Sequence, residues 1–509
     1  TLFRSELLDA APGGRAALQR RRAGARARIA GLHRRRGGRA RAGLARAGLA
    51  VARGAARRAD RAQAALGGGV AHAAGVARRD VLLAGLARAA DRRGAQLERA
   101  RALAAQALGG LGSGVFIPLT IIFILRHLPR QLLIYGLAIY AMNSEFSQNV
   151  SASLEGFYTE HWSWHWISWQ YCILLPAMFA CILYGMPRDV DDPEKLRKVD
   201  WQGLAYAWLG FGLLYAAIDQ GNRLDWLGNG TVVGLAAAGL VALGAFIARE
   251  LTSSRPVLDL RLLVQPGLIA LFLLLAGYRF IILSTAYIIP NYLQTVQNYR
   301  GLDIGSVLLW IALPQFALVV PLAFLLTRIN PRWTLGIGSA LIGIACLMAT
   351  GLTSQWATAD FLPSQVLQAV GQSLALTSLV VLVATSIKPE QAVTIGAFMQ
   401  TSRLFGGEVG VAFMQTFVRV REQIHSNLLD LHVQSQAGAT FDRLLNYGAA
   451  VGTHLVDPAG TAALATRLLA NAVSRQAYVL AYIDGFQAAA IAAGLCLLLA
   501  LLVPRTPAA

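Results

Sequence analysis

The sequence has 509 residues, of which 55% are hydrophobic and only 14% are charged, and its net charge is +19. A soluble domain is about 25% charged, so this composition argues against a large water-soluble enzyme. The charge is unevenly placed, because residues 1–108 hold 24 Arg and 6 acidic residues whereas the rest of the chain is almost neutral. Two kinds of sequence therefore join near residue 108.

Residues 1–108 consist almost entirely of Ala, Arg, Gly and Leu, and contain no Lys. The codons for Ala, Arg and Gly are rich in G and C, so a GC-rich gene read out of frame would produce this segment. A disordered arm, or an arm bound to an anionic membrane surface, is the alternative interpretation. A nucleic-acid-binding arm tethered to a membrane is a third hypothesis, but we predict no nucleic-acid partner.

From residue 109 onward, apolar runs long enough to cross about 30 Å of hydrocarbon follow one another. None of them shows the dyad alternation that is typical of barrel strands. The sequence therefore predicts an all-α polytopic membrane protein embedded in a lipid bilayer. About eleven transmembrane helices are visible, at 109–125, 131–156, 164–186, 201–218, 229–249, 267–290, 303–327, 333–351, 360–386, 390–418 and 478–503.

Lysine and arginine in the short loops predict the orientation of these spans. Counted over alternate loops, 13 basic residues lie on the side of RHLPR (126–130) and only 2, Arg223 and Arg300, lie on the other. This asymmetry predicts a cytoplasmic C-terminus. The first visible span then starts outside, so we expect an odd number of spans before it.

Five segments, taken together and in order, carry a resemblance to a known family. They are GLGSGVFIPLTIIFILR (110–126), LEGFYTEHWSWHWISW (154–169), IDQGNRLDW (218–226), RPVLDLRLL (255–263) and TSRLFGGEVGVAFMQ (401–415). They resemble helices four, five and thirteen and two intervening segments of the fourteen-span drug:proton antiporters of the major facilitator superfamily, of the EmrB multidrug-exporter type. One departure is SASLEG (151–156), which stands where that family has a Gly-Pro-x-x-Gly-Gly run.

The resemblance implies a major-facilitator fold with two pseudo-symmetric helical bundles. Residues 109–186 would then supply the remaining three spans of the first bundle, and 201–249 two extra central spans. Residues 267–503 would form the second, six-span bundle. Three further spans would be expected to precede residue 109.

Ionisable and amide side chains within membrane spans are costly and usually face a cavity or a partner. We predict that Glu145, Glu408 and Asp484 are candidates for proton coupling. Two of them have a second interpretation: Glu145 packs against a basic partner, and Asp484 is solvated at the interface. Arg279 has no carboxylate within a helical turn, so it needs a partner on another helix. The candidates for the substrate cavity or an interhelical network are Tyr278, Arg279, Asn291, Gln294, Gln400 and Arg403.

Motifs of catalysis and of nucleotide binding are missing from the sequence. It has no GxxxxGK[ST] loop, GxSxG elbow, HExxH pair or CxxC cluster, so we predict a protein that is not an enzyme and that needs no cofactor or metal. His161 and His165 stand among three Trp residues, which is typical of an interfacial aromatic belt. His425 and His432 are expected to be solvated.

An ion gradient remains as the energy source, and a carboxylate in a low-dielectric cavity is able to exchange protons. The sequence thus predicts a proton-coupled secondary transporter in a bacterial inner membrane that exports drugs or other amphipathic small molecules. An exporter of one specific metabolite or siderophore is the alternative. A binding protein without transport, tethered by its basic arm, is the alternative of another class.

Residues 419–477 form the one long predicted outer loop. Apolar residues at three- and four-residue spacing predict two amphipathic helices, at 421–433 and 461–476. These helices are expected either to lie on the membrane as lids or to form a docking surface. The resemblance implies a periplasmic membrane-fusion adaptor and an outer-membrane channel as the partners of such a surface.

Overall fold

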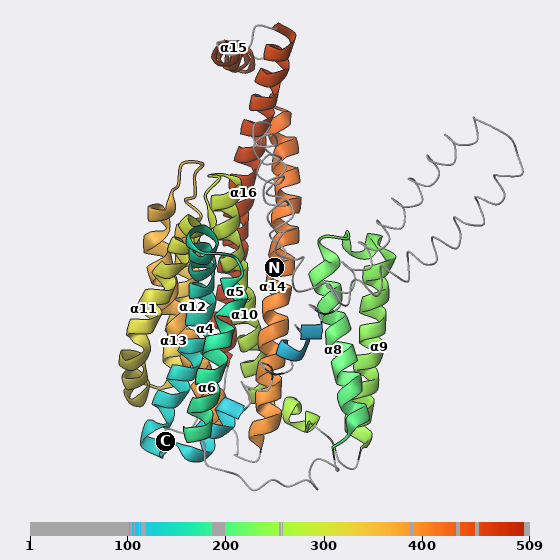
Figure 1. Cartoon of the computed structure of the whole chain (residues 1–509), viewed down its shortest axis with the longest axis vertical. Coiled ribbons are helices and arrows are strands. Elements are labelled where there is room, and N and C mark those ends of the chain that lie inside the picture. Colours follow the sequence, from blue (N-terminus) through green and yellow to red (C-terminus); the bar gives the residue numbers. More distant parts are fainter. Residues whose placement is uncertain are drawn as a thin grey trace, which may run out of the picture. The chain divides into compact units, whose positions relative to one another are not determined.

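The computed structural model divides the chain into two compact units, Thr1–Leu108 and Gly109–Ala509. It describes isolated positions between 101 and 114, and then residues 119–185, 199–253, 256, 258–386, 391–433, 438–452 and 458–502. The hypotheses about residues 1–108 therefore fall almost wholly outside the described residues. Every regular element in the described part of the chain is a helix, as Figure 1 shows.

The first helices of the second unit follow the predicted spans. Residues 119–127 are helical, and the helices that come next are α4 (Arg130–His161), α5 (Trp166–Trp169), α6 (Tyr171–Gly185), α8 (Trp201–Gly221) and α9 (Gly230–Thr252). None of the side chains of α6 is buried. This exposure is expected of an apolar helix whose surroundings are lipid rather than protein.

The remaining helices include four that begin directly at, or one residue before, a proline, where a missing N–H costs nothing. They are α10 (Pro266–Thr295), α11 (Gly301–Arg328), α12 (Pro331–Ala349), α13 (Leu362–Thr385), α14 (Ala392–Asp430), α15 (Gly438–Gly452) and α16 (Pro458–Leu502). Ten of the eleven predicted spans therefore coincide with described helices. The first, 109–125, falls partly on residues that are not described.

Seven of the described helical segments are long and apolar enough to cross a membrane. They correspond to α5 with α6, and to α9, α10, α11, α12, α13 and α16. Helices α4, α8 and α14 are not among the seven. Charged and amide residues such as Glu145 and Arg403 interrupt the apolar sequence of α4 and α14, and these same residues build the site described below.

The central pair α8 and α9 forms an antiparallel hairpin that stands beside α14 in Figure 1. Its two helices approach closely at Gly210 and Gly239, where small residues let backbones meet. Asp200 caps the start of α8 through the backbone N–H of Gly203 and accepts a hydrogen bond of 2.6 Å from Arg249 of α9. The bond from Arg249 lowers the pKa of Asp200 below its usual range.

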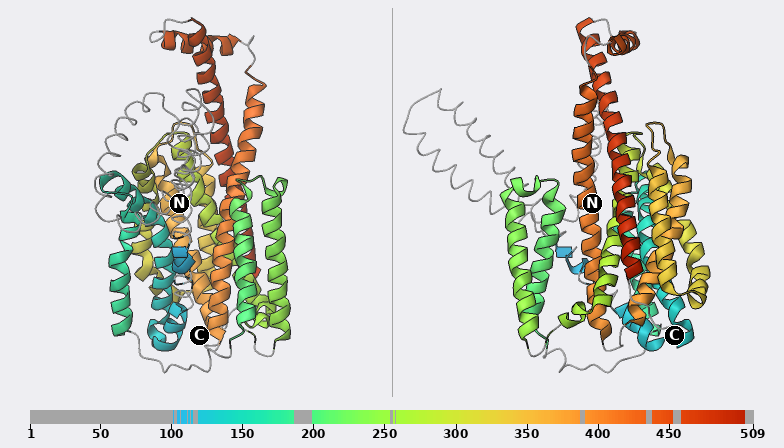
Figure 2. Two further views of the ribbon diagram at one scale, coloured as in Figure 1. Left: turned by 45° about the vertical axis from the view of Figure 1, so that its right-hand side comes forward. Right: turned by 180° about the vertical axis from the view of Figure 1, so that it is seen from behind.

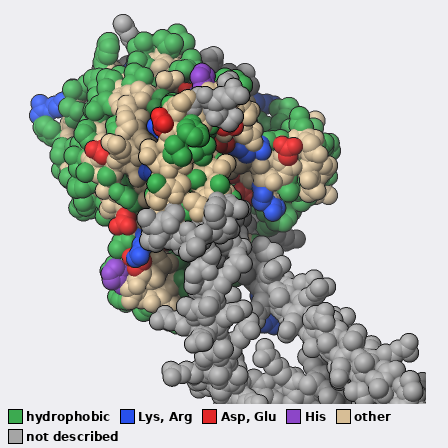
Figure 3. Space-filling view, turned by 90° about the horizontal axis from the view of Figure 1, so that it is seen from above, with side chains coloured by type: hydrophobic (Ala, Val, Ile, Leu, Met, Phe, Trp, Pro, Cys, Tyr) green, Lys and Arg blue, Asp and Glu red, His purple; other side chains and the backbone are tan. Residues whose placement is uncertain are grey.

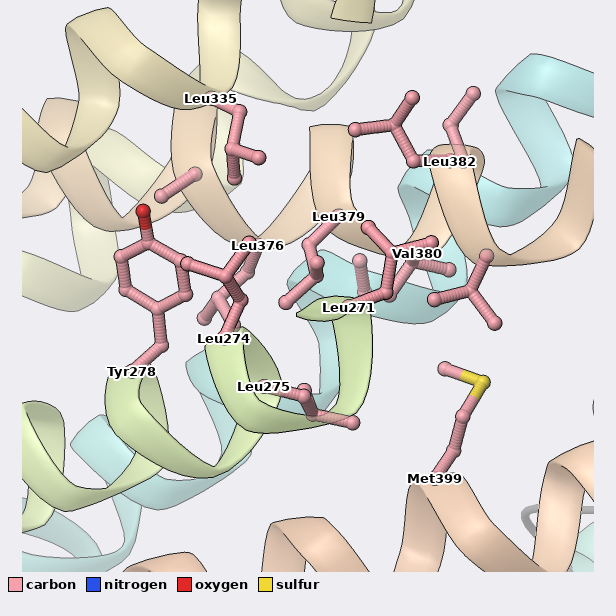
Figure 4. Close-up of a cluster of buried hydrophobic side chains, with 14 of the residues drawn as sticks. Leu271, Leu274, Leu275, Tyr278, Leu335, Leu376, Leu379, Val380, Leu382 and Met399 are labelled. Carbon is pink, nitrogen blue, oxygen red and sulfur yellow. The ribbon is translucent and has the colours of Figure 1, made fainter. Parts of the chain in front are cut away.

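Helix α13 is enclosed by other helices, and nearly all of its residues from Ser364 to Ala384 are buried. Figure 4 shows how Leu376 and Leu379 of α13 meet Leu274 of α10 and Leu335 of α12. A membrane helix enclosed by protein in this way is able to carry polar side chains that lipid would not tolerate.

The predicted surface helices at 421–433 and 461–476 are wrong as separate elements. Helix α14 runs unbroken to Asp430, and α16 begins at Pro458, so both stretches are parts of long helices that also contain the predicted spans 390–418 and 478–503. Figure 2 shows α14 and α16 rising together beyond the other helices, with α15 lying across their end. Most of the predicted outer loop 419–477 is therefore helical and stands away from the bundle.

Seen from the end that carries α15, hydrophobic side chains cover much of the described surface and charged ones are interspersed among them, as Figure 3 shows. Large apolar side chains are exposed on most of the helices, including Phe179, Trp208, Leu240, Phe316 and Leu498. A water-soluble protein rarely exposes apolar surface on this scale. The exposure agrees with a bundle that lies in a bilayer.

Helix α14 packs against α10 through glycines, and this contact positions the charged side chains of both helices. A Cβ atom on Gly406 would lie 2.6 Å from the Cα of Ala276, and one on Gly410 would lie 2.5 Å from the carbonyl oxygen of Phe280. Since 276 faces 406 and 280 faces 410, the two helices run parallel. Backbones this close leave no room for a side chain.

We therefore expect Gly410→Ala to destabilise the protein by about 1–3 kcal/mol, which is typical of overpacking. Gly244→Ala in α9 is the matched control, since no atom lies within 4 Å of the added Cβ. The measurement is thermal unfolding of both variants in detergent. Equal midpoints for Gly410→Ala and Gly244→Ala would contradict the close contact of α10 with α14.

Candidate functional site

A small cavity lies near the middle of four helices. Its walls come from α4, α10, α13 and α14, and the residues that line it are Tyr140, Ala141, Ser144, Glu145, Leu275, Arg279, Leu376, Val380, Met399, Gln400 and Arg403. The cavity volume of about 30 Å³ is room for roughly two or three water molecules. Pockets that enclose a small molecule have about 300–1,000 Å³, so this conformation holds the site closed.

A buried ion pair forms one wall of the cavity. Nη1 of Arg279 on α10 lies 2.5 Å from Oε1 of Glu145 on α4, and Nη2 donates to Oε1 of Gln148 at 3.0 Å. Arg279 and Glu145 are each 3% exposed. Glu145 is thus the carboxylate that Arg279 was expected to find on another helix.

The hydrogen bonding of this pair is incomplete. Oε2 of Glu145 and Nε of Arg279 are buried and have no partner. A buried ion pair repays its desolvation only when its remaining donors and acceptors are satisfied. The free oxygen of Glu145 is therefore available to a proton, and both free atoms are available to a polar group that enters the cavity.

Arg403 and Gln400 bring further polar groups to the same cavity from α14. Arg403 lies within electrostatic range of Arg279, Glu145 and Tyr140. Among the described residues, Arg403 has no carboxylate within ion-pair distance. Oε1 of Gln400 is buried and unpartnered. The cavity therefore brings two guanidinium groups and one carboxylate together, with apolar side chains around them.

Four other predicted site residues lie away from this cavity. Tyr278 directly precedes Arg279 in the sequence, but its side chain points toward α12, where its hydroxyl bonds to Ser339. Figure 4 shows Tyr278 directed toward the helix that carries Leu335. Asn291 donates to the carbonyl of Tyr287 at 2.8 Å. Gln294 is half-buried further along α10, and Glu408 on α14 lies near Tyr215 of α8. The structure thus joins Glu145, Arg279, Gln400 and Arg403, and separates the others from them.

Asp484 forms a second cluster of charges, where the extended parts of α14 and α16 meet. Its Oδ2 lies 2.6 Å from Nε of Arg421 and 2.6 Å from Nε2 of His425. The prediction that His425 is solvated is wrong, because its side chain is only 16% exposed. Arg421 was not identified, although its spacing of four from His425 places both side chains on one helix face.

A third polar group is made of three amides, none of them among the predicted site residues. Nδ2 of Asn149 donates to Oε1 of Gln315 at 3.1 Å, and Nε2 of Gln315 donates to Oε1 of Gln372 at 3.0 Å. These residues come from α4, α11 and α13. The chain of bonds therefore joins three helices that are far apart in the sequence.

Beyond these amides, toward the end that carries α15, helices α4 and α11 touch backbone to backbone. A Cβ atom on Gly305 would lie 2.6 Å from the Cα of Ser153, and one on Gly156 would lie 2.9 Å from the Cα of Leu302. Ser153 also donates to the carbonyl of Gly305 at 2.6 Å. This close contact, in the SASLEG stretch of an unbroken α4, closes the bundle at that end.

The sequence profile of the Major Facilitator Superfamily matches residues 101–411. This chain belongs to the Major Facilitator Superfamily. A match across more than half of the chain accords with the helical architecture and with a polar site enclosed among helices. It also agrees with the resemblance carried by the five segments of the sequence.

Named relatives place the chain beside EmrB-type multidrug exporters. It is 30% identical over 202 residues to the lincomycin resistance protein LmrB of Listeria monocytogenes, a match that covers 39% of this chain and 42% of that protein. It is 25% identical to the colistin resistance protein EmrB of Acinetobacter baumannii over 345 residues, 66% of this chain and 65% of that protein. The multidrug export protein EmrB of Escherichia coli is 22% identical over 328 residues, 62% of each chain. The chain thus spans less than two thirds of the length of each of these relatives.

Proposed function

We propose that this superfamily member is a proton-coupled secondary transporter that exports amphipathic small molecules across the bacterial inner membrane, with its C-terminus in the cytoplasm. The observation that carries the proposal is the buried pair of Glu145 and Arg279 in a cavity that is otherwise largely apolar. The names of the relatives, which refer to lincomycin, colistin and multidrug export, support a drug-like cargo.

The chemistry of the pair supports coupling to protons. When Glu145 is ionised, it holds Arg279 by a charge-assisted bond. When Glu145 takes up a proton, this attraction is lost and the guanidinium group of Arg279 is free to contact another group in the cavity. A site that carries either a proton or cargo exchanges one for the other, and so proton entry drives export.

The closed contact of α4 with α11 supplies the second requirement of such a cycle. In transporters built of two bundles, rocking of one bundle against the other opens the site to alternate sides. Here the backbone contact at Gly305 and Gly156 holds the bundles together at the end that carries α15. Export in this scheme requires that contact to part.

The direct test measures uptake of the fluorescent cation ethidium into inside-out vesicles from cells that express the chain. An imposed gradient with an acidic interior is expected to drive ethidium uptake, and a protonophore is expected to abolish it. ATP is left out of the assay. Uptake that needs ATP, or that ignores the gradient, would contradict the proposal.

We also propose that the extended hairpin of α14 and α16, with α15 across its end, is the docking surface for a periplasmic adaptor of an outer-membrane channel. Large apolar side chains are exposed on this hairpin although it stands away from the bundle, among them Leu428, Leu431, Phe441 and Leu445. Exposed apolar patches rimmed by polar residues are typical of protein contacts.

Replacing both Leu428 and Leu431 by Ser is expected to weaken binding of a co-expressed adaptor by at least about a hundredfold, since burial of each Leu side chain in the contact contributes about 1.5–3 kcal/mol. Replacing Leu240 and Val241 of α9, which are also exposed, provides a control on a different surface. Unchanged recovery of the adaptor with the Leu428 and Leu431 variant would argue against this docking surface.

A further inference from the structure

The amide chain described above borders a second cavity. Asn149 of α4, Thr285 of α10, and Gln365 and Gln372 of α13 contribute its polar walls, and apolar side chains of α10 and α11 complete it. Its volume of about 10 Å³ is room for roughly one water molecule. It shares no lining residue with the cavity of Glu145 and Arg279, although Asn149 lies one helical turn from Glu145.

One group in this cavity lacks a partner. Gln365 is only 4% exposed, yet its Oε1 has no hydrogen-bond partner. Its Nε2 lies 3.5 Å from the hydroxyl of Ser364, a long hydrogen bond. A buried acceptor without a donor is destabilising, and native proteins seldom keep one unless a ligand or a water completes it. The site is therefore complementary to a group that brings a donor.

Gln368, on the same helix as Gln365, is equally buried but has a hydrogen-bond partner. Gln368 is 3% exposed, but its Nε2 donates to the hydroxyl of Thr285 at 3.3 Å, and it does not line the cavity. Burial on α13 therefore does not by itself leave an amide without a partner. The unpartnered acceptor of Gln365 belongs to the cavity.

The position of the cavity suits a binding site that changes during transport. Asn149 lies on α4, whereas Gln365 and Gln372 lie on α13. In the two-bundle architecture that the sequence predicts, α4 belongs to the first bundle and α13 to the second. Relative movement of the bundles would enlarge the space between these walls. The walls offer neutral amides and a hydroxyl, with no ionisable group among the lining residues.

We propose that the cavity beside Gln365 is a second binding site, which takes an uncharged hydrogen-bond donor of the cargo, a hydroxyl or an amine N–H. This inference rests on the proposed export function. It divides recognition between two places: the charged cavity at Glu145 interacts with charge, and the amide cavity selects cargo that carries donor groups.

The test compares two lipophilic cations of equal charge. Ethidium carries two aromatic amines that donate hydrogen bonds, whereas tetraphenylphosphonium has no donor or acceptor. Gln365→Met keeps the length of the side chain and removes the acceptor. It is expected to raise the KM for ethidium by about tenfold, the effect of roughly one hydrogen bond, and to leave the KM for tetraphenylphosphonium unchanged.

Gln368→Met is the matched control, because it alters an equally buried amide that does not line the cavity. It is expected to affect both probes alike. Equal changes of the two probes in Gln365→Met, or no change in either, would overturn the second site and would indicate packing or a bound water instead. If the unmodified chain exports neither probe, the proposed function itself is contradicted, and the two failures are thereby distinguished.

Discussion

Arg279→Leu is expected to destabilise the protein by about 3–5 kcal/mol, because it strips a buried carboxylate of its cation. In the structure, Arg279 is the one residue within ion-pair distance of Glu145 among the described residues, and both side chains are almost fully buried. Leu fills much of the volume of the Arg side chain, so most of the lost stability reflects the buried carboxylate of Glu145, which no longer has a cation beside it. Thermal or denaturant unfolding in detergent micelles measures the effect.

A double variant separates charge from packing. Arg279→Leu combined with Glu145→Leu removes both charges, and such replacements are often neutral or stabilising, so most of the lost stability is expected to return. Arg223→Leu serves as the control, since Arg223 is exposed and bonds only to the amide of Gln220 at 2.7 Å. Its effect is expected to stay within about 0.5 kcal/mol. A loss in Arg279→Leu no larger than in Arg223→Leu would show that the pair is not formed.

Glu145→Gln is expected to abolish ethidium uptake that is driven by the proton gradient, while exchange of labelled for unlabelled ethidium continues. Gln keeps the shape of Glu145 and an oxygen that accepts from Arg279, but it carries no ionisable proton. Binding and the movement of the bundles therefore remain, whereas coupling to the gradient is lost. Uptake and exchange assays in the same vesicles provide the measurement.

Glu408→Gln and Asp484→Asn are informative companions to this variant. Both residues were candidates for coupling on sequence grounds, but Glu408 lies near Tyr215 of α8 and Asp484 bonds to Arg421 and His425. Neither lines the cavity of Glu145. We expect both variants to retain gradient-driven uptake. Loss of coupling in either of them, with coupling intact in Glu145→Gln, would show that Glu408 or Asp484, and not Glu145, is the carboxylate that couples transport to protons.

The helical spans could be predicted from the sequence because each depends on a local property, the length of an apolar run. The same local pattern was misleading at 419–477. There the polar residues around Leu428 and Leu431 suggested separate surface helices, whereas α14 and α16 continue without a break. Amphipathic spacing indicates which face of a helix is apolar, but it does not reveal whether the helix continues from the span before it.

The charge pair was partly predictable, since an isolated Arg279 within a span must have a partner. The sequence did not identify which carboxylate would serve, because Glu145 is 134 positions away along the chain. The amide chain was harder still, since Gln315 and Gln372 are single polar residues within apolar runs. A lone amide in a span satisfies no spacing rule, and only the packing of α4, α11 and α13 brings the three together.

The most direct test of the central claim, that Glu145 exchanges a proton for cargo, measures protons released when cargo binds. Purified protein in weakly buffered detergent solution is mixed with ethidium, and a pH-sensitive dye records the change. At a pH acidic enough that Glu145 carries a proton before cargo binds, release of about one proton per bound ethidium is expected, since one carboxylate changes its protonation state, and no release is expected from Glu145→Gln that still binds ethidium. Equal release from both proteins, or binding without release from the unmodified protein, would contradict the claim.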